Sequence, residues 1–114
     1  GPEVRDVLTA LNTGHDGGWA TIHANGARDV PARLAALGAL AGMSESAVAA
    51  QAASAIDAVL HMRRDADGHR WVSEVGVLTR ARGPLECALA LSATADGCVT
   101  THEAWASLAR RVGL

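Results

Sequence analysis

The amino-acid sequence predicts an α+β protein in which helices come first and β-hairpins follow. In the first half, apolar residues such as Val30, Leu34 and Leu37 recur at the spacing of an amphipathic helix. In the second half, the Asp67-Gly68 and Asp96-Gly97 dipeptides each separate runs in which apolar and polar residues alternate. The spacing of apolar residues therefore changes from that of a helix to that of a strand, which divides the chain into a helical part and a sheet.

The first predicted helix runs from Pro2 to Leu11, with proline in its first turn. The turn Asp16-Gly17-Gly18 follows and can present free backbone N–H groups. From Trp19 to Ala24, small or aliphatic residues alternate with larger or polar ones, which predicts a short strand that carries Thr21 and His23 on one face. Because residues two apart on a strand are separated by roughly 7 Å, this face can contact a polyanion such as a triphosphate.

Two further helices are expected before the sheet. The first runs from about Arg28 to Leu40 and is ended by Gly42. Its predicted apolar face consists of Val30, Leu34, Leu37 and either Leu40 or Ala41. A serine, Ser44 or Ser46, then caps a helix that reaches about Ala55. The small residues of this helix favour close packing against its neighbour.

The second half is expected to contain two hairpins and a last helix. The first hairpin joins residues 58–64 to residues 69–80, and the second joins residues 86–93 to residues 98–100. The final helix is expected to be capped by Thr100 or Thr101, because Glu103 lies at capping-box distance from Thr100. Its apolar stripe is predicted to contain Trp105, Leu108 and either Ala109 or Val112.

Composition narrows the classes of function. A chain of 114 residues is one small domain or a piece of a larger one. Its formal net charge of −2 argues against a general nucleic-acid or membrane-surface binder. All 10 basic residues are arginine, so the lysine of a P-loop is missing. No apolar run reaches the length of a membrane span and no signal-peptide pattern opens the chain, so the cytoplasm is the expected location.

Cysteines and histidines outside the first 25 residues give only weak site candidates. Cys87 and Cys98 lack metal-ligand spacing and are expected to be reduced and structural. His61 and His69 flank the first hairpin turn, where they could face each other. Two histidines alone do not make a metal site, so no metal is expected.

The strongest signal is the stretch from Asn12 to Asn25, which reads NTGHDGGWATIHAN. Its TGHDGG and T-x-HAN strings resemble the histidine box of the secretion ATPases. These are the P-loop motors of type II and type IV secretion, conjugation and Tad-type pili. The resemblance continues by motif through residues 1–80 and by shape through residues 81–114. We refer to residues 12–25 as the histidine box.

The resemblance implies roles for residues of the histidine box. His23 is the candidate catalytic residue, which would donate a hydrogen bond to the γ-phosphate of ATP or to a phosphate-coupled switch, and Thr21 would support it. His15 and Gly17 would contact the nucleotide, with Asp16 shaping the loop. On chemistry alone, each has an ordinary alternative: His15 as a loop-stabilising group, His23 as a core histidine with satisfied hydrogen bonds, and Thr21 as a strand former.

Two arginines match the family pattern in the helix after the histidine box. Arg28 and Arg33 are implied to face a phosphate or a neighbouring subunit of the motor. The ordinary alternative is that both lie on a solvated helix face.

For the whole chain, the resemblance implies the C-terminal portion of a RecA-like P-loop ATPase domain. Residues 1–80 would complete the ATPase core, and residues 81–114 would form a C-terminal hairpin and helix. The whole motor would be a hexamer that uses ATP and Mg²⁺ to assemble pili or export substrates. It would act with inner-membrane platform proteins at the inner face of the cytoplasmic membrane, without binding nucleic acid directly. Because this chain lacks a P-loop and a Walker B strand, it is not expected to bind ATP tightly or hydrolyse it alone.

Two other functions are compatible with the sequence. The first is a non-catalytic, stand-alone α+β interaction module derived from such an ATPase. Its predicted box strand would have unpaired edges unless another segment covered them. The second, more distant, is a hydrolase that uses His15, Asp16 and Thr21, but no hydroxyl lies on a strained nucleophile turn.

Overall fold

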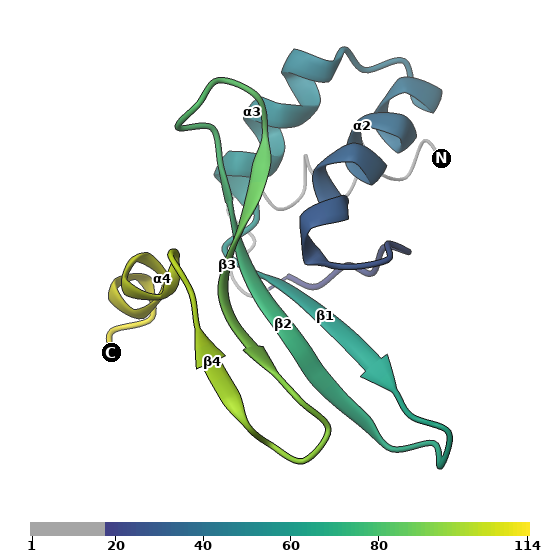
Figure 1. Ribbon diagram of the computed structural model, residues 1–114. Helices are drawn as coiled ribbons and strands as arrows, with labels where there is room; N and C mark the ends of the chain where they lie inside the picture. Colours follow the sequence, from purple (N-terminus) through teal and green to yellow (C-terminus); the bar gives the residue numbers. More distant parts are fainter. Residues whose placement is uncertain (1–17) are drawn as a thin grey trace.

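The fold was obtained as a computed structural model, which describes residues 18–114. The predicted helix from Pro2 to Leu11, and the turn residues Asp16 and Gly17, lie outside the described residues. Within 18–114 the elements are η1 (Ala27–Asp29), α2 (Val30–Leu40), α3 (Glu45–Ala55), β1 (Val59–Arg64), β2 (Arg70–Thr79), β3 (Glu86–Ala93), β4 (Val99–Thr101) and α4 (Trp105–Arg111). Helices therefore precede the hairpins, and the predicted α+β class is confirmed (Figure 1). None of the helices in this range combines the length and the apolar content that crossing a bilayer requires.

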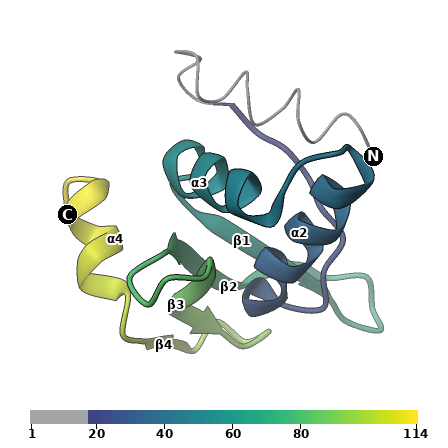
Figure 2. The ribbon, with the colours of Figure 1, turned by 90° about the horizontal axis from the view of Figure 1, so that it is seen from above.

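The helices α2 and α3 pack side by side and are bounded by the predicted signals (Figures 1 and 2). Gly42 has a φ of 77°, a left-handed conformation that suits glycine after a helix end. Ser44 is the N-cap of α3, and its Oγ accepts a hydrogen bond from the backbone N–H of Ala47 at 3.1 Å. Of the two serines considered, Ser44 is therefore the cap.

The apolar face of α2 differs from the prediction at its C-terminal end. Val30 and Leu34 are buried as predicted, and of the two alternatives at the end of the face, Leu40 is 77% exposed whereas Ala41 is half-buried. Gly38 is buried instead. A Cβ at position 38 would overlap the side chain of Val48 on α3, so the absence of a side chain there allows close packing of the two helices.

The four strands form one antiparallel sheet in the order β1-β2-β3-β4. Both predicted hairpins are confirmed, and their turns contain Gly68 with a φ of 84° and Gly97 with a φ of 90°. In the first turn, Asp65 Oδ1 accepts hydrogen bonds from the backbone N–H groups of Asp67 and His69, at 3.0 Å and 2.9 Å. Strands β1 and β4 form the two edges of this sheet.

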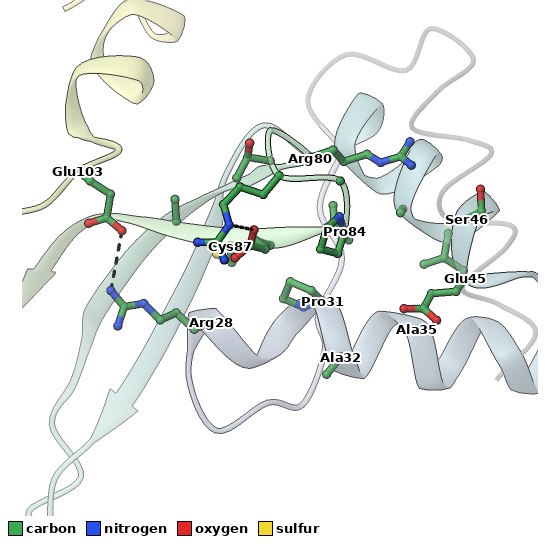
Figure 3. Close-up of a pocket in the computed structure, with 18 residues that line it drawn as sticks. Arg28, Pro31, Ala32, Ala35, Glu45, Ser46, Arg80, Pro84, Cys87 and Glu103 are labelled. Atoms are coloured by element: carbon green, nitrogen blue, oxygen red, sulfur yellow. Dashed lines mark ion pairs between the residues drawn. The ribbon is translucent and has the colours of Figure 1, made fainter.

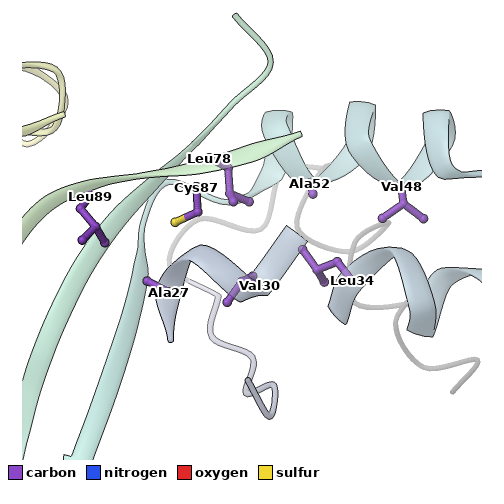
Figure 4. Packing of buried hydrophobic residues seen from close by; sticks show 8 residues of the cluster. All are labelled: Ala27, Val30, Leu34, Val48, Ala52, Leu78, Cys87 and Leu89. Atoms are coloured by element: carbon purple, nitrogen blue, oxygen red, sulfur yellow. The ribbon is translucent and has the colours of Figure 1, made fainter. Parts of the chain in front are cut away.

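Helices pack on both faces of the sheet at one end, with η1, α2 and α3 on one face and α4 on the other, while the hairpin turns extend beyond them (Figures 1 and 2). Because strand side chains alternate, neighbouring residues Val77 and Leu78 of β2 belong to different core clusters. The cluster beneath η1, α2 and α3 consists of Ala27, Val30, Leu34, Val48, Ala52, Leu78, Cys87 and Leu89 (Figure 4). The cluster beneath α4 consists of Val77, Ala90, Ala104 and Leu108.

The predicted threonine cap of the last helix is wrong. Both Thr100 and Thr101 lie in β4, and Ala104 is the N-cap of α4, with no side-chain hydrogen bond. The backbone N–H groups of His102 and Ala104 instead donate to carbonyl oxygens of β3, at 2.9 Å and 3.0 Å. These backbone bonds fix the start of α4 on the sheet, so the helix begins without a threonine cap. Leu108 is buried as predicted, whereas Val112 is 60% exposed.

Candidate functional site

The described part of the histidine box has no regular secondary structure, so the predicted strand over residues 19–24 is wrong. The reason is that no strand of the described sheet pairs with it. The predicted alternation of faces is nevertheless present. Ile22 and Ala24 pack against the core beneath α2 and α3, while Thr21 and His23 are exposed.

The structure locates two of the four candidate nucleotide-contacting residues. His15 and Gly17 lie outside the described residues. Thr21 and His23 lie on the segment that leads into η1, and neither makes a hydrogen bond within residues 18–114. Because His23 is exposed, its alternative interpretation as a core histidine is wrong. Both side chains can therefore reach a ligand from solvent.

The two candidate arginines have different surroundings. Arg28 lies in η1, and its Nη2 is 3.9 Å from Glu103 Oε1, with the two side chains 64% and 61% exposed. At this exposure, the ion pair contributes little to stability. Arg33 is exposed on α2 and forms no ion pair with any described residue. Of the two arginines, only Arg28 therefore forms an ion pair with a described residue, in the turn between β4 and α4.

A carboxylate on β2 holds the end of the histidine box. Glu74 Oε1 accepts a hydrogen bond from the backbone N–H of Ala27 at 2.8 Å. Ala27 is fully buried, and a Cβ on the preceding Gly26 would lie 3.3 Å from the same oxygen. Sequence reasoning used Glu74 only as part of a family pattern and missed this contact. The available signal was a single charged residue within the mostly apolar segment WVSEVGVL.

Cys87 lies beneath the same junction and is a packing residue. A Cβ at Gly76 would overlap Cys87 Sγ, so the glycine makes room for the thiol. Burial, and to a lesser extent the charge of Glu74, raise the pKa of Cys87 from 9.0 to about 11, against the lowering effect of Arg28. Cys87 is therefore a protonated, unreactive thiol at neutral pH. Cys98, by contrast, is exposed, so the expected structural role applies to Cys87 alone.

A row of polar residues crosses the sheet next to the end of the histidine box. The register pairs His61 with Glu74, Glu74 with Ser92, and Ser92 with Thr100, and paired residues share a face. These residues line a hollow of about 340 Å³ together with Asn25, Gly26, Arg63, Ser73, Ala93, Thr94 and Cys98. Ser92 Oγ also lies 2.8 Å from His102 Nε2. The hydroxyl and imidazole groups of this hollow are suited to hydrogen bonding with a polar ligand.

A larger groove of about 920 Å³ lies between α2, α3 and the loop that joins β2 to β3 (Figure 3). Its floor is mainly small and apolar, including Pro31, Ala32 and Ala35. Charges of both signs surround it, including the Arg28–Glu103 pair and the Arg82–Glu86 pair at 3.4 Å. This mixture of charges does not favour an anionic or a cationic ligand.

The hairpin histidines do not form a metal site. The expectation that His61 and His69 could face each other is wrong, because His61 pairs with Glu74 in the register. His69 instead stacks on Trp71, with ring centroids 6.0 Å apart and planes inclined by 12°. Within residues 18–114, no three histidine, cysteine, aspartate or glutamate residues are grouped so that they could hold a metal ion.

Comparison with known proteins identifies the family. The family model described as "Type II/IV secretion system protein" matches residues 1–111. This chain belongs to that family. The resemblance of this chain to the secretion-system family is thus confirmed over nearly its whole length, including residues 81–111, where only the shape had suggested it.

Two relatives of this chain are each named "Putative conjugal transfer protein". They come from Mycobacterium tuberculosis, strains CDC 1551 / Oshkosh and ATCC 25618 / H37Rv. Each is 49% identical over 86 residues, which cover 75% of this chain and 24% of the relative. The chain thus spans about a quarter of the length of these curated relatives.

Proposed function

We propose that this chain is the C-terminal part of a RecA-like ATPase that drives secretion or conjugal transfer. In this proposal, Thr21 and His23 of the histidine box contact the phosphates of ATP. Membership of the secretion-system family supports the proposal, as do the names of the two relatives. The exposure of both side chains supports the assigned contact.

The observation that carries the proposal is the hydrogen bond from the Ala27 N–H to Glu74. It fixes the end of the histidine box to the sheet, while Ile22 and Ala24 fix its inner face to the core. A segment held in both ways presents Thr21 and His23 with little conformational freedom. Such preorganised donors stabilise developing phosphate charge better than mobile ones do.

ATP is the substrate in this proposal, and this chain supplies only part of its site. The chain has no lysine, so a P-loop from another part of the protein would bind the phosphates. The Thr21 hydroxyl and the His23 imidazole can each donate one hydrogen bond to a phosphate oxygen. We assign no described residue to Mg²⁺. We further propose a homo-hexamer in which Arg28 contacts the neighbouring subunit, associated with inner-membrane platform proteins.

The substitution His23→Ala in the complete native protein tests the proposal. We expect ATP turnover to fall by about tenfold or more, because one preorganised donor to the transferred phosphate is lost. His69→Ala is the matched control, since His69 is an exposed histidine on the first hairpin. Unchanged turnover in the His23→Ala protein would remove the role assigned to this residue.

A non-catalytic interaction module is the second candidate. It is favoured by the two core clusters, one on each face of the sheet within residues 18–114. A module of this kind should unfold in one cooperative transition when the 114-residue chain is studied alone. Cooperative unfolding, combined with turnover that resists both Thr21→Ala and His23→Ala in the complete protein, would favour the module over the motor.

A further inference from the structure

Part of the sheet face that carries α4 is left uncovered near the first hairpin. The α4 cluster reaches Val75 and Ala58, but Leu60 and Met62 of β1 are 45% and 52% exposed. Both point to the α4 face, because Val59 packs on the opposite core and strand side chains alternate. Met62 is paired with half-buried Val72 on β2, so the apolar surface extends across two strands.

This apolar surface ends in a pair of arginines. Arg64 pairs directly with Arg70 across the hairpin, and like charges in directly opposed positions destabilise a sheet. Neither arginine forms an ion pair with any residue in 18–114, and the nearby Asp65 carboxylate is hydrogen-bonded within the turn. A Cβ at Gly68 would lie 4.0 Å from Arg64 Nε, so this guanidinium lies beside the turn. Within residues 18–114, neither guanidinium group is therefore neutralised by a direct ion pair.

We propose that this surface, which we call the hairpin face (Leu60, Met62, Arg64, Arg70 and Val72), binds an acidic amphipathic segment of a partner protein. Apolar side chains of that segment would cover Leu60 and Met62. Its carboxylates would pair with Arg64 and Arg70, in the planar geometry that guanidinium groups favour. The hairpin extends away from α2 and α3, which leaves this end of the sheet accessible (Figure 1).

Charge favours such a partner over a second copy and over a membrane. The hairpin face has no carboxylate of its own, so two copies joined through it would leave the arginines unneutralised. Binding to an anionic lipid surface typically uses clusters of about four to eight basic residues. The β1–β2 hairpin brings Arg63, Arg64 and Arg70 together with two aspartates, and the chain carries a net charge of −2. This inference does not depend on ATP hydrolysis.

The test uses the full 114-residue chain and a fluorescently labelled peptide of alternating glutamate and valine, with binding followed by anisotropy. The double variant Arg64→Glu/Arg70→Glu should weaken binding by about tenfold or more, since two charge-assisted contacts become repulsive. Arg80→Glu/Arg82→Glu changes the net charge equally at exposed sites beyond the other end of β2, and should alter binding by about twofold or less. The variant Leu60→Ser/Met62→Ser reverses no charge and should also weaken binding, because it removes the apolar side chains that the segment would cover.

Several outcomes would overturn the proposal. One is equal weakening in the two arginine double variants, and another is equal affinity for a peptide in which glutamine replaces glutamate. Tighter binding to phosphatidylglycerol vesicles than to the peptide would identify a membrane as the occupant. Self-association in sedimentation that Arg64→Glu/Arg70→Glu abolishes would identify a second copy. Circular dichroism of each variant establishes that the sheet is intact before binding is compared.

Discussion

At the scale of single residues, the Cys87 thiol lies at the junction between the end of the histidine box and the sheet. It lies beside Gly76 beneath buried Ala27, within the electrostatic reach of Glu74 and Arg28. Its pKa of about 11 in the folded protein exceeds its ordinary value of 9.0. A group whose pKa is raised by folding adds stability while it is protonated and loses that contribution as it ionises.

The free energy of unfolding should therefore decrease as the pH rises from 9 to 11, on the order of 1–2 kcal/mol. The contribution is fully present below pH 9. The chain contains no lysine and no tyrosine, so few other groups titrate in this window. Urea unfolding at several pH values measures the effect, and Cys87→Ala should flatten it. A slope that persists in Cys87→Ala would show that another group is responsible.

Glu74 should stabilise the folded protein mainly because its oxygen accepts the hydrogen bond from Ala27, and less because of its charge. Glu74→Ala leaves the buried N–H of Ala27 without a partner, which costs about 1–3 kcal/mol. Glu74→Gln keeps an oxygen acceptor at that position and should cost less. It should also lower the pKa of Cys87, because the charge of Glu74 raises it. Urea unfolding and the pH dependence of thiol alkylation measure the two effects, and equal destabilisation by both substitutions would contradict this role.

At the scale of elements, the spacing of α2 and α3 depends on Gly38. Gly38→Ala would normally favour a helix by up to about 1 kcal/mol. Here the added Cβ overlaps the stiff, buried side chain of Val48, and overpacking of this kind costs about 1–3 kcal/mol.

We therefore expect Gly38→Ala to lower the free energy of unfolding despite its better helix propensity. The double variant Gly38→Ala/Val48→Ala tests the cause, because it removes the overlap. A coupling free energy near zero between the two substitutions, measured by urea unfolding, would contradict this packing explanation.

At the scale of the whole molecule, most elements could be predicted because their signals are local. The Asp-Gly turns, Gly42 and the serine cap each depend on neighbouring residues, and the structure confirms all of them, with Ser44 as the cap of the two serines considered. The errors concern contacts between distant residues. The threonine cap failed because the chain after β4 bonds to the carbonyl oxygens of β3.

The same distinction applies to the candidate site. Alternation along the histidine box correctly predicted which side chains face the core, but a strand requires a neighbouring strand, and the described sheet supplies none. The contact between Glu74 and Ala27 spans 47 positions, so the local pattern could mark Glu74 as unusual but could not identify its partner. The polar row from His61 to Thr100 likewise depends on strand register, which becomes known only when the sheet is assembled.

The most direct test of the central claim is the NMR signal of the His23 imidazole in the complete native protein. The signal is assigned by comparison with His23→Ala and followed during addition of a non-hydrolysable ATP analogue with Mg²⁺, and separately of ADP with Mg²⁺. Contact with the γ-phosphate predicts a shift with the ATP analogue that ADP does not reproduce. A His23 signal that is unchanged by the ATP analogue at saturation would contradict the account.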